Sequence, residues 1–164
     1  MTMCRVLTAA LAAIWVGFAG PASAQTEAEK VLLGVTPEDV AGVVQEAGFR
    51  AKIGKTSDGL HQISSKTQGI DFYIYVVDCD TNLSKDCITL TFGAYLAPNT
   101  KLTADAMNQW NADRKFTRAF VDEAGDPSLE MDVSTYGVTH KYLLDLIDVW
   151  DTRVGKFLDH INWN

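Results

Sequence analysis

The run Ile70-Asp71-Phe72-Tyr73-Ile74-Tyr75-Val76-Val77 decides the fold of this chain. Most of its residues are β-branched or aromatic, which is the composition typical of a strand. Side chains of a strand alternate between the two faces of a sheet. One face would carry Ile70, Phe72, Ile74 and Val76, and the other Tyr73, Tyr75 and Val77. Because both faces are substantially apolar, we expect this strand to be central in its sheet.

Other strand and helix patterns lie on both sides of this run. Thr36-Pro37-Glu38-Asp39 combines a capping residue, a proline at the first helical position and an acid that can complete a capping box. Thr103 can cap a second helix, and residues 138–161 have the apolar spacing of a third. Strands are expected at 49–54, 60–65, 70–77, 88–96, 115–122 and 128–134. The order α-β-β-β-β-α-β-β-α predicts a single α+β domain, an antiparallel sheet with flanking helices.

The N-terminus has the pattern of a secretory signal peptide. Arg5 precedes an uncharged, mostly apolar run, and Pro21-Ala22-Ser23-Ala24 ends in small residues suited to cleavage before Gln25. The apolar run is shorter than the roughly 20 residues of a spanning helix, so we expect no membrane span. We therefore expect a signal peptide at 1–24, a flexible segment at 25–35, one domain at 36–164, and export to the periplasm or beyond.

The mature chain would be acidic. The full sequence has 14 Lys and Arg against 21 Asp and Glu, and loss of Arg5 leaves 13 against 21, a net charge of −8. Such a surface repels nucleic acid and anionic lipid, so neither is an expected partner.

Two cysteines remain after export, Cys79 and Cys87. They flank a polar segment between two expected strands, and an even pair in an oxidising compartment predicts a disulfide at the neck of a hairpin. A redox-active pair is the alternative, but the CxxC spacing and the neighbouring base that favour it are absent from the sequence.

No sequence pattern for catalysis or metal binding is complete. Asp78, Asp80 and Asn82 match the first ligands of a calcium loop, but Leu83 replaces the required glycine and Thr89 the final glutamate. The three histidines lack ligand spacing. We expect no enzyme activity and no cofactor; a hydrolase would need two acidic residues brought together in one cleft.

The apolar stripe of the helix at 138–161 is wider than burial of one face requires, because Tyr142, Leu144 and Val149 lie beside it. The excess fits either core burial or contact with a partner. Trp110 and Asn111 have the same two interpretations, core or recognition edge. The candidate partner surface is therefore Trp110, Asn111, Tyr142 and Val149.

The chain resembles the YbjN-type domain, a family described as bacterial sensory transduction regulators. The resemblance spans residues 36–161 and is carried by Trp110-Asn111, Lys115-Phe116-x-Arg118-Ala119, Asp122-Glu123-x-Gly125-Asp126-Pro127-x-Leu129-x-Met131-Asp132, the turn at 45–51 and the Asp58-Gly59 hairpin. It implies a fold similar to that of type III secretion chaperones, and it implies no enzyme activity, cofactor or catalytic residue.

Together these observations favour an exported binding or regulatory domain that recognises a protein partner in the cell envelope or forms a homodimer. The alternative is a carrier or sensor of a small apolar ligand. In that case Tyr73, Tyr75 and Tyr95 would share one sheet face and line a concavity beneath a helix.

Overall fold

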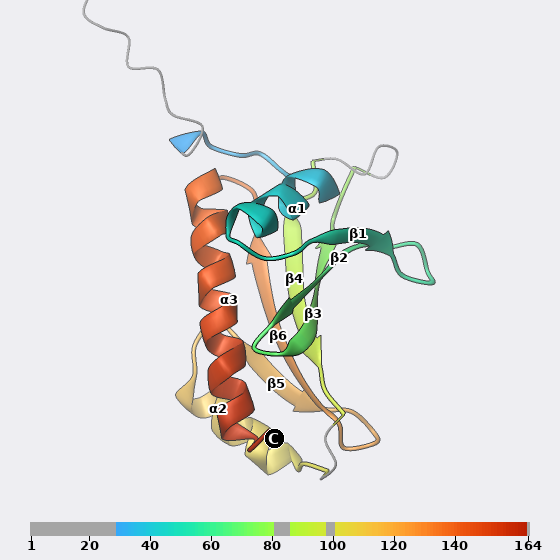
Figure 1. Cartoon of the computed structure of the whole chain (residues 1–164), viewed down its shortest axis with the longest axis vertical. Helices are drawn as coiled ribbons and strands as arrows, with labels where there is room; N and C mark the ends of the chain where they lie inside the picture. Colours follow the sequence, from blue (N-terminus) through green and yellow to red (C-terminus); the bar gives the residue numbers. More distant parts are fainter. Residues whose placement is uncertain (1–28, 81–85, 98–100, 164) are drawn as a thin grey trace, which may run out of the picture.

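The computed structural model describes residues 29–80, 86–97 and 101–163, so the expected signal peptide lies outside the described residues. The order of elements predicted from the sequence is confirmed, as is the α+β class. The elements are α1 (Pro37–Glu46), β1 (Lys52–Lys55), β2 (His61–Thr67), β3 (Ile70–Val77), β4 (Thr89–Tyr95), α2 (Ala104–Asp113), β5 (Arg118–Val121), β6 (Pro127–Ser134) and α3 (His140–His160). Figure 1 shows their arrangement.

The strands form one sheet in the order β1-β2-β3-β4-β6-β5, with every neighbouring pair antiparallel. β3 lies inside the sheet, as its two apolar faces predicted.

The edge strands β1 and β5 are shorter than expected, for local reasons. The Phe49 N–H donates to Val44 O at 3.1 Å, which keeps the chain beside α1 until β1 begins. Phe116 has a φ of 72°, which delays the start of β5.

All three helices pack on the same face of the sheet. Trp150 of α3 lies against Phe72 and Phe92, with ring centroids 6.0 and 5.5 Å apart. Trp110 of α2 meets Phe157 of α3 edge-on at 5.1 Å. In the described part of the chain, the helices fall short of the length and apolar character that a membrane crossing requires.

The chain before α1 is held by backbone pairing. The Leu32 N–H donates to Val138 O at 2.7 Å, and Val35 exchanges two hydrogen bonds with Cys87. Gly34 permits this approach, because a Cβ there would lie 2.6 Å from the Asp86 backbone. Residues 32–35 were expected to belong to a flexible segment. They are instead anchored, because their partners lie far along the chain, where the local sequence pattern could not reveal them.

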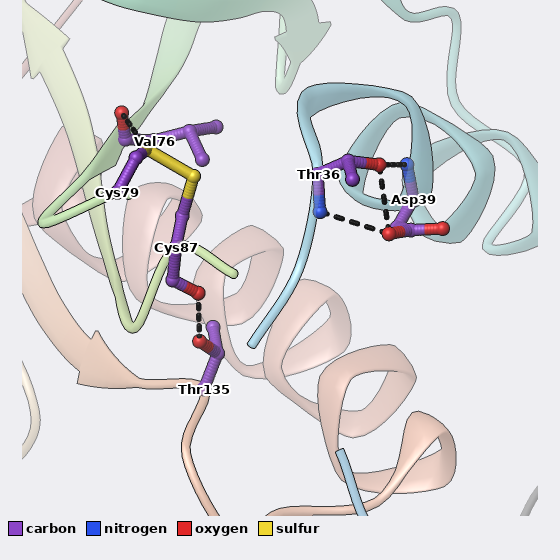
Figure 2. The surroundings of a disulfide bond; sticks show 6 residues. All are labelled: Thr36, Asp39, Val76, Cys79, Cys87 and Thr135. Carbon is purple, nitrogen blue, oxygen red and sulfur yellow. Dashed lines mark hydrogen bonds between the residues drawn. A yellow bond between two sulfur atoms is a disulfide. The ribbon is translucent and has the colours of Figure 1, made fainter. Parts of the chain in front are cut away.

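The predicted disulfide between Cys79 and Cys87 is present in the structure (Figure 2). Cys87 is fully buried, and its carbonyl accepts a hydrogen bond of 2.7 Å from the Thr135 hydroxyl. The cross-link therefore ties the end of β3 to the point where the segment before α1 meets the end of β6.

Removing this cross-link should weaken the domain without abolishing its fold. Loop-closure entropy predicts a loss of about 2.5 kcal/mol in the free energy of unfolding, for reduced protein and for a Cys79→Ala, Cys87→Ala variant alike. Urea unfolding of the oxidised, reduced and variant proteins measures the loss. Labelling of both thiols in unreduced mature protein, or an unchanged urea midpoint after reduction, would contradict the prediction.

Candidate functional site

The face of the sheet opposite the helices carries an ordered row of side chains. Successive Cα partners across the six strands form this row, namely Lys52, Ser64, Tyr73, Gly93, Glu130 and Arg118. The neighbouring row contains Gln62, Tyr75, Thr91 and Asp132. We call the part formed by Tyr73, Tyr75, Tyr95, Glu130 and Arg118 the tyrosine face.

Tyr95 is placed by a glycine. Its ring lies back along β4 over Gly93, where a Cβ would be 2.6 Å from the phenol oxygen. The phenol reaches the next strand and donates to Glu130 Oε1 at 2.9 Å. The Tyr95 ring lies 6.4 Å from that of Tyr73, which stacks on Tyr75 at 6.3 Å. The three tyrosines thus share one face, as their spacing predicted.

The prediction that these tyrosines lie beneath a helix is wrong. The helices (Figure 1) pack on the face that carries Phe72 and Phe92, and strand alternation puts the tyrosines on the other face. On the helix side, the void between α1, α3 and the sheet measures about 10 Å³. That volume accommodates about one water molecule and no organic ligand. The helix-covered concavity expected of a carrier is not found in this part of the structure.

Glu130 is a buried charge with its partners in place. Arg118 donates to Glu130 Oε2 from Nε at 3.0 Å and from Nη2 at 2.6 Å, and its Nη1 lies 3.2 Å from Asp132 Oδ2. The Thr91 hydroxyl donates to Asp132 at 2.6 Å. Glu130 lies on the sheet face that the helices leave open, but Tyr95 and Arg118 cover its side chain. Two carboxylates do meet here, and the single Arg118 guanidinium contacts both.

Burial raises the pKa of two phenols on this face, those of Tyr75 and Tyr95. Burial raises the pKa of Tyr95, and the hydrogen bond to the Glu130 carboxylate raises it further. Burial also raises the pKa of Tyr75, against an opposing hydrogen bond with Tyr95. The hydrogen bond to Glu130 raises the pKa of Arg118, which holds its charge. The face therefore presents neutral aromatic hydroxyls beside a fixed cation, which suits binding rather than proton transfer.

The structure removes Trp110 from the candidate partner surface. It is 1% exposed, and its indole N–H donates to Thr117 Oγ1 at 3.1 Å, so the core interpretation holds. Asn111 is exposed, but its amide makes two hydrogen bonds to the backbone of Ala119, at 2.9 and 2.7 Å, that hold β5. Tyr142, 43% exposed, and the half-buried Val149 remain accessible on α3, on the helix side of the sheet.

Metal binding finds no support within residues 29–80, 86–97 and 101–163, where no cluster of three or more His, Cys, Asp or Glu side chains could hold an ion.

The chain folds as an α+β domain whose helices leave one face of the sheet open. The model of the YbjN family, described as "Putative bacterial sensory transduction regulator", matches residues 36–163. The chain therefore belongs to the YbjN family, as the sequence resemblance indicated. The family description supports a regulatory or binding role. No curated protein matches the chain.

Loss of the Arg118 guanidinium should destabilise the domain, because Glu130 would stay buried without its cation. We expect Arg118→Gln to lower the free energy of unfolding by about 1–3 kcal/mol. A second change, Glu130→Gln, should restore part of the loss, since the buried group would then be neutral. Urea unfolding of both single variants and the double variant measures the coupling. Lys115→Gln, at an exposed position nearby, is the control and should leave the free energy of unfolding nearly unchanged. If Arg118→Gln lowered it no more than Lys115→Gln does, the prediction would be contradicted.

Tyr95 should make stability depend on alkaline pH. Its folded pKa lies above the ordinary tyrosine value of roughly 10, so its contribution is full below that pH and is lost as pH rises further. We expect the free energy of unfolding to fall above about pH 10, and to fall less steeply in Tyr95→Phe. Denaturant unfolding across this range gives the slope. Tyr136→Phe is the matched control, and equal slopes in Tyr95→Phe and wild type would disprove the assignment.

Proposed function

We propose that the mature chain is an exported, non-enzymatic regulator of the cell envelope that recognises a partner protein through its tyrosine face. The observation that carries this proposal is the open sheet face itself, where three partly exposed tyrosine rings lie together and the Tyr95 hydroxyl donates to Glu130. Tyrosine is enriched at protein interfaces because its ring offers contact area and its hydroxyl a hydrogen bond.

On the tyrosine face, Tyr95 and Arg118 are already held in the absence of a partner. Gly93 seats the Tyr95 ring, and Glu130 accepts from both Tyr95 and Arg118. Binding to such a surface costs little side-chain entropy, because the rotamers are already selected. A partner would meet a flat aromatic surface with the Arg118 charge at its margin.

Two observations support the proposal that the protein is exported. The signal-peptide pattern at residues 1–24 directs a chain across a membrane. The Cys79–Cys87 disulfide is a bond that persists in oxidising compartments and is rare in the cytosol. We therefore place the proposed regulatory interaction in the periplasm or outside the cell.

Removal of two tyrosine rings should release the partner. We expect Tyr73→Ala, Tyr75→Ala to weaken association about tenfold or more, because truncated aromatic anchors dominate interface energies. Native mass spectrometry of mature protein isolated gently from its own envelope fraction reads the bound partner and its stoichiometry. Thermal unfolding checks that the double variant is folded.

Tyr136→Ala is the matched control, since Tyr136 is 62% exposed and lies in the turn after β6. We expect it to retain the partner. A homodimer that the double variant breaks would identify the partner as a second copy of this chain. A folded double variant that keeps its partner, or a wild-type protein that carries none, would contradict the proposal.

A further inference from the structure

A second site lies at the edge of the sheet, where β1 leaves β2. β1 pairs only with residues 61–64, and the last pair is Lys52 with Ser64. Residues 65–67 of β2 continue the pairing with β3 on one side. On the other side, no strand in the described part of the chain pairs with them.

The end of α1 creates this opening. Gly48 adopts a φ of 90° after the helix, a left-handed conformation that favours glycine. The Phe49 N–H donates to Val44 O, and this hydrogen bond directs the chain along the helix, away from β2. The result is a groove of about 450 Å³ lined by Gly48, Phe49, Arg50, Ser64, Ser65, Lys66 and Asp71. We call it the β2-edge groove; its volume lies within the range of ligand sites.

The groove is positively charged in an acidic protein. Lys66 pairs with Asp71 at 2.6 Å, whereas Arg50 and Lys52 make no ion pair with a described residue. The whole chain has a net charge of −7, so Arg50 in the groove and Lys52 beside it form a local excess of positive charge at one end of the open edge. Asp151 accepts a hydrogen bond from the Thr67 hydroxyl at the other end. Lysines on an edge strand ordinarily discourage pairing between copies. Arg50, however, precedes the strand and lines the groove, where it can receive an anion.

Ser65 adds a polar group without a partner. It is 7% exposed and lines the groove, and its hydroxyl makes no hydrogen bond in the described structure. A buried hydroxyl gains from any acceptor or donor that reaches it. The groove thus combines an open strand edge, a free guanidinium and an unsatisfied hydroxyl.

We propose that the β2-edge groove binds the extended C-terminal end of another polypeptide. The backbone of that segment pairs with residues 65–67 of β2, as an added strand, and its terminal carboxylate is received by Arg50. The site is distinct from the tyrosine face, so this inference goes beyond the proposed function and can fail without it.

The test uses the isotope-labelled mature protein and a pool of acetylated, randomised pentapeptides. One pool carries free carboxylates and the other is amidated at the C-terminus. We expect the carboxylate pool to shift the backbone amide resonances of residues 48–50 and 64–67, and the amidated pool to bind about tenfold more weakly, the difference expected of one charge-assisted hydrogen bond. Arg50→Gln should weaken binding of the carboxylate pool by the same factor.

Arg114→Gln, which removes a guanidinium at the end of α2 and outside the groove lining, is the matched control and should bind like wild type. Equal binding of the two pools, unchanged binding by Arg50→Gln, shifts confined to other residues, or no shift at millimolar peptide would each overturn the proposal. Equally tight binding of hexanoate, a free carboxylate without a peptide backbone, would also overturn it. The tyrosine face is tested by native mass spectrometry of the Tyr73→Ala, Tyr75→Ala variant, and the groove is tested by peptide titration. Either proposal can therefore be contradicted while the other stands.

Discussion

The contact of Trp150 with Phe72 and Phe92 determines how the two layers of this domain meet. The Trp150 side chain is fully buried, and its indole N–H has no hydrogen-bond partner among the described residues, so the contact depends on apolar packing. It holds α3 across β3 and β4, the middle of the sheet. α1 and α2 then pack beside α3 on the same face. One layer of helices leaves the opposite face of an antiparallel sheet to solvent, and β3 must therefore present Tyr73 and Tyr75 there.

The open face accommodates this exposure with tyrosine and one compensated charge. A phenylalanine in place of Tyr95 could cover Gly93, but it could not satisfy Glu130, which is nine-tenths buried between strands. A buried carboxylate without partners costs far more than a paired one contributes, so Arg118 and Tyr95 are required together. The same requirement fixes their rotamers. Rigidity on this face is therefore a consequence of burying Glu130, and it prepares the surface for binding.

Local signals in the sequence were sufficient for most of the fold and for little of the site. The capping threonines Thr36 and Thr103 identify two helix starts, because a cap involves only neighbouring residues. Alternation placed Tyr73 and Tyr75 on one face, but it could not say which face the helices cover, since both are apolar. The sequence alone left open whether Trp110 and Asn111 belong to the core or to the surface. The answer depends on the position of β5, because the Asn111 amide bonds the Ala119 backbone. β1 begins later than expected because the Phe49 N–H donates to Val44 O after the end of α1. The alternation of side chains along a strand gives no sign of such a hydrogen bond.

The tyrosine face and the β2-edge groove are neighbours in the sheet. Ser64 lines the groove and is the Cα partner of Tyr73, so one strand spacing separates the two sites. A polypeptide paired with β2 at residues 65–67, as proposed, would lie beside the end of this row. One partner can therefore use both sites, with backbone pairing supplying affinity at the edge and aromatic contact supplying selectivity on the face. Two weak contacts joined in one chain bind far more tightly than either alone, because the second association is intramolecular.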